Sequence, residues 1–274
     1  MFGSIIVPLD VYPSSGAWDP MFDICAPSTF ARGSCSTKTD QNRAASYPQV
    51  QLTAIINVSD GPGDGALPNS AYAKDITTLN GFENIRTVGY VATTWCNRDL
   101  NSVLDDGVAY SFWGEYEDSL AVDGIFVDET PTQYSPDSDS YLQAIAQAIH
   151  DSDGLKKGYI VHNSGALPDP LFFEEANSQD GDNLRPDLTI VFENSFAYWS
   201  TQSSMLADVT STYNRDKIAV VLHSVPDLGT LGIITTLSEV LAVGHSMWLT
   251  GSTNYTNLDA LFPVVLECLV ALLS

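Results

Sequence analysis

Positive charge is what this sequence has least of. Its 274 residues include 11 Lys and Arg against 34 Asp and Glu, which gives a formal net charge of -23. Because binding to phosphate backbones requires basic side chains, we expect no nucleic-acid partner. The acidic surface has two interpretations that the sequence leaves open. It keeps the protein soluble in an exposed environment, or it steers a cationic substrate into a negative cleft.

Long apolar runs and metal-binding spacings are also lacking. No apolar run reaches the roughly 18 residues of a transmembrane helix, and the C-terminal segment 258–273 is interrupted by Pro263 and Glu267. We therefore expect no membrane association. No group of His, Cys, Asp or Glu has the spacing of a metal site, so we expect no metal and no cofactor.

Cysteine is scarce too and indicates the compartment only weakly. A bridge between the first two cysteines would pin the polar loop between them in an oxidising compartment, and separately buried thiols are the alternative. No secretory leader precedes the first predicted strand, so the extracellular or cell-wall location that we expect requires this sequence to be a mature form. The four cysteines are Cys25, Cys35, Cys96 and Cys268.

Eight short apolar runs are spread over the whole chain. Their hydrophobicity is near-continuous rather than alternating, which is typical of parallel strands covered on both faces. The predicted strands are 5–11, 52–56, 86–91, 122–127, 159–161, 188–192, 218–222 and 246–249.

Segments of helical character lie between these runs. In 137–150, the clearest of them, Leu142, Ile145 and Ile149 are spaced for one helix face. The strand-then-helix order and the length, close to the roughly 250 residues of such folds, predict an α/β protein with one (β/α)8 TIM barrel domain over residues 1–274. The other predicted helices are 72–79, 100–113, 198–213, 228–243 and 258–273, with a short one at 168–176.

Carboxylates follow three of the predicted strands. Asp10 follows the first, Asp128 and Glu129 the fourth, and Glu193 the sixth. Barrel enzymes carry their active sites where the C-terminal strand ends meet, so we expect these side chains to converge there. Any one of them could instead cap a helix or pair with a base, above all Asp10 and Glu129. Strict alternation would let only one of Asp128 and Glu129 face the barrel axis.

Aromatic, amide and imidazole side chains occur at the same strand ends. Rings stack on sugar faces, amides and imidazoles bind hydroxyl and acetamido groups, and cleavage of a glycosidic bond requires two acids. The sequence therefore indicates a sugar-binding cleft, although a structural role is an equal alternative for the two histidines. The residues expected to bind substrate are Asp10, Tyr12, Trp18, Asn57, Tyr90, His162, Asn163, Asn194, His223 and Trp248, with Trp95 and Tyr198 at equivalent heights.

Seven segments carry a family resemblance. They are IIVPL at 5–9, YPSSGAW at 12–18, IIN at 55–57, TVGYV at 87–91, DGIF at 123–126, VHN at 161–163 and VFE at 191–193. In combination they resemble the spherulin-4 (spherulation-specific) family, glycoside hydrolase family 135. The resemblance implies a (β/α)8 endo-α-1,4-N-acetylgalactosaminidase that acts on galactosaminogalactan, a secreted biofilm polysaccharide that is partly deacetylated and hence cationic. It also implies that the essential acids are Asp128, Glu129 and Glu193.

These observations lead to one mechanistic hypothesis. We predict a retaining endo-glycosidase with Asp128 as nucleophile, Glu193 as general acid/base and Glu129 tuning charge or orientation. Assistance by the substrate's own acetamido group ranks lower, because it needs that group on the reacting face. The alternative function is a non-catalytic carbohydrate-binding, cell-wall or spore-coat protein on the same barrel. We expect a monomer whose partner is a polysaccharide.

Overall fold

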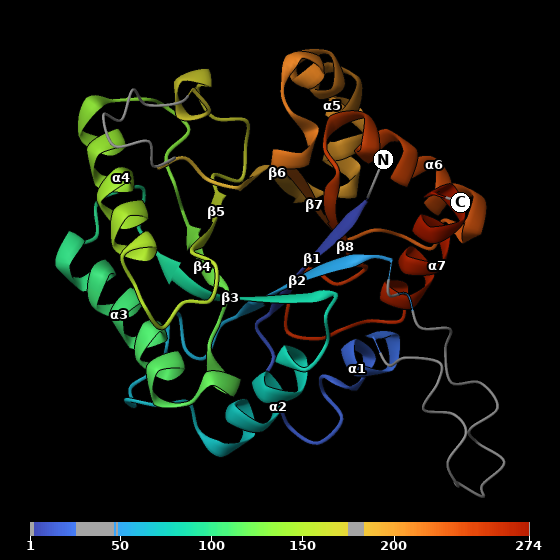
Figure 1. Ribbon diagram of the computed structural model, residues 1–274. Helices are drawn as coiled ribbons and strands as arrows, with labels where there is room; N and C mark the ends of the chain where they lie inside the picture. Colours follow the sequence, from blue (N-terminus) through green and yellow to red (C-terminus); the bar gives the residue numbers. More distant parts are fainter. Residues whose placement is uncertain (1–2, 26–46, 48, 175–183, 274) are drawn as a thin grey trace, which may run out of the picture.

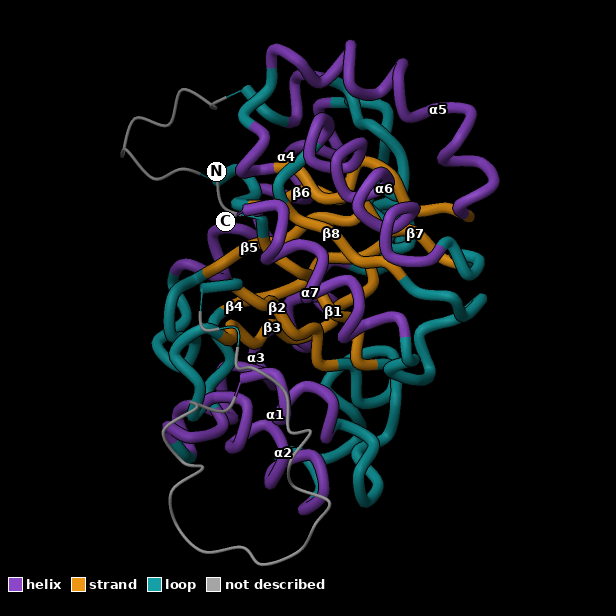
Figure 2. The backbone as a smooth tube through the Cα atoms, turned by 90° about the vertical axis from the view of Figure 1, so that its right-hand side faces the viewer, coloured by secondary structure: helices purple, strands orange, loops and turns teal. Residues whose placement is uncertain are grey.

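Eight parallel strands form a closed barrel in the computed structural model, which describes residues 3–25, 47, 49–174 and 184–273. The strands follow one another in sequence order around the barrel, and β8 pairs with β1 to close it (Figure 1). Helices flank the strands on the outside, as the side view in Figure 2 shows. The predicted (β/α)8 barrel is therefore confirmed.

The elements lie close to their predicted positions. The strands are β1 (Ser4–Leu9), β2 (Gln51–Ile56), β3 (Ile85–Ala92), β4 (Gly124–Asp128), β5 (Tyr159–Asn163), β6 (Leu188–Ser195), β7 (Ile218–His223) and β8 (Ser246–Leu249). The α-helices of the described residues are α1 (Asp19–Cys25), α2 (Ser70–Asn80), α3 (Leu100–Tyr116), α4 (Pro136–His150), α5 (Phe196–Val209), α6 (Gly229–Val243) and α7 (Leu261–Leu273).

Two segments differ from the prediction. The described part of 168–176 holds only a single 3-10 turn, η4 (Pro170–Phe172), in place of the short helix. Helix α1 was not predicted, because its seven residues are too few to show a helical repeat, although Asp19 supplies the acidic first turn that favours a helix start. The proposed bridge between the first two cysteines falls outside the described side chains, and Cys96 and Cys268 are free thiols.

The end of β3 is positioned by Tyr110 of α3, which is fully buried. Its hydroxyl donates to the Ile56 carbonyl over 3.0 Å and accepts from the Tyr90 backbone N–H over 3.1 Å. Gly89 makes this approach feasible, since a Cβ there would lie 2.6 Å from the Tyr110 ring. Strands β2 and β3 are thereby tied together just below the barrel mouth.

Asp123 lies immediately before β4, at the N-terminal end of the strands, and its carboxylate is bound on several sides. It is 4% exposed, accepts the Thr87 backbone N–H over 3.0 Å and pairs with Lys157 over 2.9 Å. A buried carboxylate with both a donor and a counter-ion is a structural group. The carboxylates at the C-terminal strand ends have different surroundings.

Candidate active site

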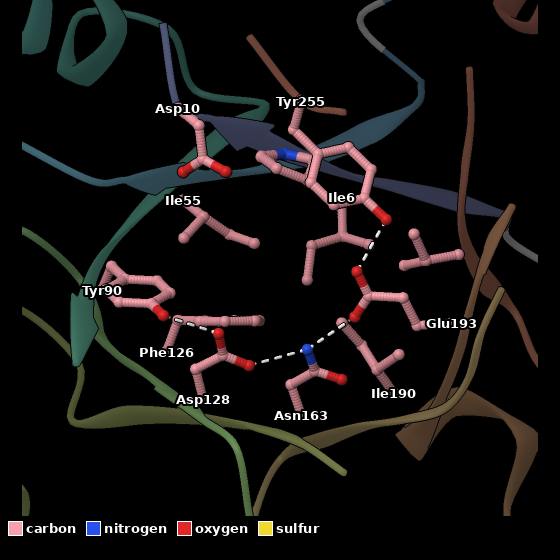
Figure 3. Close-up of a pocket in the computed structure, with 12 residues that line it drawn as sticks. Ile6, Asp10, Ile55, Tyr90, Phe126, Asp128, Asn163, Ile190, Glu193 and Tyr255 are labelled. Carbon is pink, nitrogen blue, oxygen red and sulfur yellow. Dashed lines mark hydrogen bonds between the residues drawn. The ribbon is translucent and has the colours of Figure 1, made fainter. Parts of the chain in front are cut away.

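Four hydrogen bonds run across the barrel mouth and join two carboxylates (Figure 3). The Tyr90 hydroxyl donates to Asp128 Oδ2 over 2.7 Å, and Asn163 Nδ2 donates to Asp128 Oδ1 over 2.8 Å. The same nitrogen donates to Glu193 Oε2 over 2.7 Å, and the Tyr255 hydroxyl donates to Glu193 Oε1 over 2.6 Å. Side chains from β3, β4, β5, β6 and the loop after β8 thus form one network.

Asn163 at the end of β5 sets the distance between the two acids. Its Oδ1 accepts the Gly165 backbone N–H over 3.0 Å, so the amide is oriented with both of its hydrogens toward carboxylates. The nearest oxygens of Asp128 and Glu193 cannot be farther apart than these two bonds laid end to end, about 5.5 Å. The predicted convergence of residues 128 and 193 on one mouth is what the structure shows.

A β-bulge in β6 turns Glu193 into the mouth. Ile190 and Glu193 both line the pocket, although strict alternation would place residues three apart on opposite faces. The pairing of β6 with β7 shifts register between Ile190 and Phe192, which inserts the extra residue. Phe192 faces outward onto Trp199 of α5, with ring centroids 5.2 Å apart. Without this bulge the carboxylate would point into the helix layer.

The floor of the pocket is apolar, and its acids lack basic partners. Ile6, Ile55, Phe126 and Ile190 lie beneath the polar groups. The ion pairs found in the described residues leave these acids out; they join Lys74 to Asp75, Arg98 to Asp106, Lys157 to Asp123, Arg185 to Asp139 and His245 to Asp216. The mouth is therefore a negative site with hydrogen-bond donors but no counter-ion among the residues described.

Asp10 is the third carboxylate of the pocket. Its Oδ1 accepts Asn57 Nδ2 over 2.9 Å, and Asn57 in turn accepts the Gly61 backbone N–H over 3.3 Å. Burial raises the pKa of Asp10, and the charges of Asp128 and Asp60 raise it further, against the Asn57 hydrogen bond. Asp10 therefore favours a ligand group that donates a hydrogen bond or carries positive charge.

The two tyrosines of the network remain donors. Burial raises the pKa of Tyr90 and of Tyr255, and the negative charge of Asp128 or Glu193 beside each hydroxyl raises it further. Both phenols therefore stay protonated at any pH at which the fold is intact, and both hold their carboxylate by its charged oxygen.

Glu129 lies beside Asp128 in a left-handed backbone conformation, with φ of 55°. This conformation costs a residue with a Cβ about 1–2 kcal/mol. Its carbonyl is held by the Trp95 N–H over 2.7 Å and the Thr93 hydroxyl over 3.0 Å. Its carboxylate raises the pKa of Tyr90 and has no hydrogen-bond partner within the described part of the chain. Strain of this kind concentrates at functional sites.

Comparison with known proteins identifies the family of this chain. Residues 4–269 match the model of spherulation-specific family 4. The chain belongs to this family. Among solved structures, Aspergillus clavatus Sph3 in complex with GalNAc has 30% sequence identity and a TM-score of 0.82, with 98% of this chain and 97% of that chain covered. The family resemblance of the sequence motifs is thereby confirmed.

Two further comparisons add nothing to this assignment. The Prevotella bryantii endo-beta-mannanase/endo-beta-glucanase PbGH26A-GH5A has 10% identity and a TM-score of 0.48, over 97% of this chain and 48% of that chain. A search of curated proteins found no match. Within the described ranges of this spherulation-specific family 4 chain, no helix has the length and apolarity to cross a bilayer, and no group of three metal-ligating side chains occurs.

Four of the residues predicted to bind substrate lie at the rim of the mouth. Tyr12 is 55% exposed and packs edge-on against Tyr72, with centroids 5.5 Å apart. His223 is half-buried beside the Ser224 hydroxyl, and Asn194 is exposed, with its Oδ1 accepting the backbone N–H of the next residue. Asn57 completes the set through its contact with Asp10.

Three other predicted contacts are corrected, because their side chains are buried and do not line the pocket. Trp18 is fully buried and donates from Nε1 to the Val11 carbonyl over 3.0 Å. Trp248 is 2% exposed and packs on Phe262 of α7. His162 is 7% exposed and lies among outward-facing residues toward α4, where burial lowers its pKa to about 4 and the charge of Arg185 adds to the effect. None of the three lines the pocket around Asp128 and Glu193.

Tyr255 is the site residue that sequence reasoning missed. It lies in the polar loop after β8 and reaches back over the barrel to Glu193. The available signal was one aromatic residue within the hydrophilic segment 250–257 that follows the last strand. The prediction placed the aromatic contact in the strand itself, at Trp248, which is buried and does not line the pocket.

Proposed function

We propose that this chain is an endo-acting glycoside hydrolase that cleaves an α-1,4-linked polysaccharide containing N-acetylgalactosamine and galactosamine, of the galactosaminogalactan type. The observation that carries the proposal is the pair Asp128 and Glu193, joined through Asn163 at the mouth of the barrel. A binding protein has no need for two facing carboxylates held at a fixed spacing, whereas cleavage of a glycosidic bond uses two such acids.

The spacing supports retention of configuration. Retaining enzymes hold their carboxyl groups roughly 5–5.5 Å apart, and inverting enzymes roughly 6.5–9.5 Å to admit a water. The upper bound of about 5.5 Å between the nearest oxygens of Asp128 and Glu193 supports the closer, retaining arrangement. Attack by a carboxylate then forms a glycosyl-enzyme ester, which water hydrolyses in a second step.

The hydrogen bonds around the two acids support different roles for Asp128 and Glu193. Asp128 accepts three hydrogen bonds, from Tyr90, Asn163 and the Glu129 backbone N–H, which orient its carboxylate as a nucleophile requires. Glu193 accepts two, from Asn163 and Tyr255. To protonate the leaving oxygen, Glu193 carries a proton on one oxygen and turns it toward the sugar, which opens one of these two contacts. It takes the proton back from water in the second step.

The pocket's charge supports an amino sugar as part of the substrate. Asp10 and Glu129 add negative charge around the pair without counter-ions in the described chain, and a galactosamine ammonium would supply the missing positive charge. Sph3 was crystallised with GalNAc. We therefore propose that sugars of the galactosamine series bind here, in acetylated or free-amine form.

The biological setting follows from the substrate class. A polysaccharide of this kind lies outside the cell, so we propose an extracellular or cell-wall location, a role in turnover of biofilm or wall polymer, and action as a monomer with a single-domain barrel. Rings and amides at the rim, among them Tyr12, Asn57 and His223, would contact neighbouring sugars of the chain.

A glycan panel tests the proposal. Wild-type protein is incubated with galactosamine-, glucosamine- and galactose-containing polymers, and products are read by mass spectrometry. We expect internal cleavage of the α-1,4-linked galactosamine polymer, with the first product keeping the α configuration in proton NMR. Oligosaccharide binding without new reducing ends over a long incubation would replace the hydrolase with the non-catalytic carbohydrate-binding alternative.

A further inference from the structure

Trp95 breaks the pattern of the other tryptophans. All five tryptophans of the chain lie in described segments, and four of them, at positions 18, 113, 199 and 248, are at most 2% exposed. Trp95 is 58% exposed. Tryptophan is highly buried on average, and a large ring left in water at a functional mouth is the usual mark of a binding surface.

The backbone that presents this ring is unusual. Thr94, Trp95 and Cys96 have φ values of 50°, 53° and 62°, so three consecutive residues with side chains adopt the left-handed conformation. Residues other than glycine visit this region rarely and as single residues, and a β-branched residue such as Thr94 is a clear outlier there. Conformations of this kind persist only where the surroundings enforce them.

Several hydrogen bonds enforce this turn, and they tie it to the acids. The Trp95 N–H donates to the Glu129 carbonyl over 2.7 Å, and the Thr93 hydroxyl donates to the Asp128 carbonyl over 2.9 Å. The Arg98 N–H closes the turn on Thr93 over 3.1 Å. The turn carrying Trp95 is therefore bonded directly to Asp128, the last residue of β4, and to Glu129, which follows it.

We propose that Trp95 is the platform of an outer sugar-binding subsite on the β3 and β4 side of the mouth, where a pyranose ring of the polysaccharide stacks on its indole face. This subsite rests on the proposed function, since it presupposes a polysaccharide in the cleft. The rigid turn holds the ring in place before the ligand arrives, so little side-chain freedom is lost on binding. An ammonium group on the sugar adds a cation–π attraction, which is strongest on Trp.

Quenching of tryptophan fluorescence reports on Trp95, because the other four tryptophans are buried and shielded from a quencher. Acrylamide quenching is measured on the full-length Glu193→Gln protein with an α-1,4-linked N-acetylgalactosamine hexasaccharide, and with the GalNAc monosaccharide for comparison. We expect the hexasaccharide to lower the quenching constant at least twofold and the monosaccharide, which fills only the pocket, to leave it unchanged. Hexasaccharide binding seen by calorimetry with unchanged quenching would overturn the subsite and leave the hydrolase intact. Absence of any hexasaccharide binding would overturn both.

Kinetics separate a subsite from a structural role. For Trp95→Ala we expect the KM for long polymer to rise about tenfold, as for the loss of one large aromatic contact in a binding surface. The kcat for a short aryl glycoside that reaches only the cleavage point stays within about twofold, and Trp95→Phe recovers part of the polymer affinity. Tyr116→Ala is the matched control, since Tyr116 is 63% exposed at the far end of α3. An equal loss of kcat on both substrates, or equal effects of Trp95→Ala and Tyr116→Ala, would overturn the subsite.

Discussion

Replacing Asn163 with alanine is the perturbation that probes the network most sharply. The substitution removes both amide hydrogens between Asp128 and Glu193. Two unit charges about 5.5 Å apart repel by about 3 kcal/mol at an effective dielectric constant of about 20. Each hydrogen bond to a charged group contributes about 1.5–3 kcal/mol, so the two donors offset this repulsion. Without them the repulsion is unopposed, and the two carboxylates lose their fixed orientation.

The assay is kcat on the galactosamine polymer. For Asn163→Ala we expect kcat at neutral pH to fall about a hundredfold, because both acids lose their orientation. Asn101→Ala is the control, since Asn101 is exposed in the first turn of α3, and thermal unfolding shows that both variants are folded. A kcat within about threefold of wild type would refute the bridging role of Asn163.

Two predictions concern stability. His162 in the folded protein has a pKa of about 4, below its usual 6.5. Its neutral form therefore contributes about 3 kcal/mol to the free energy of unfolding above pH 6.5, and this contribution is lost as the pH falls toward 4. Urea unfolding between pH 7 and 4.5 should show this loss, and His162→Gln should flatten it; equal slopes in both proteins would contradict the assignment. Arg185→Met leaves Asp139 buried without its cation and should lower the free energy of unfolding by about 3–5 kcal/mol. Lys74→Met, at an ion pair whose lysine is 82% exposed, should cost less than about 1 kcal/mol, and similar losses in the two variants would refute the argument.

The sequence was sufficient for the barrel, because eight near-continuous apolar runs alternating with helical segments have few other uses in a chain of this length. Seven of the eight predicted strands overlap the observed ones within a few residues at either end, and the eighth has the same bounds. The longer helices were found for the same reason. Helix α1 and the turn Pro170–Phe172 were misjudged, because elements of seven and three residues carry no measurable period.

Side-chain direction was the part that the sequence could not supply. When both faces of a strand are buried, apolar residues occupy both, and nothing in the pattern distinguishes the barrel axis from the helix layer. His162 and Asn163 are neighbours in β5, yet only Asn163 faces the mouth. Glu193 faces it because of a bulge that leaves no sequence signature.

Long-range contacts from loops were equally out of reach. Tyr255 bonds Glu193 across 62 residues of chain, and its loop has no repeat or motif that predicts this return. The acids themselves were placed correctly at one mouth, because the C-terminal ends of all strands in a parallel barrel meet there. The barrel topology was therefore enough to locate the site, whereas the packing of side chains and loops determines which residues line it.

The central claim is that Asp128 and Glu193 together break the glycosidic bond. The decisive measurement is the initial rate of new reducing ends from an α-1,4-linked galactosamine polymer with wild-type, Asp128→Asn and Glu193→Gln proteins at matched folded concentrations. We predict a loss of about a thousandfold or more in each variant, since each removes one of the two acids that the reaction uses. A rate near that of wild type in either variant would contradict the central claim.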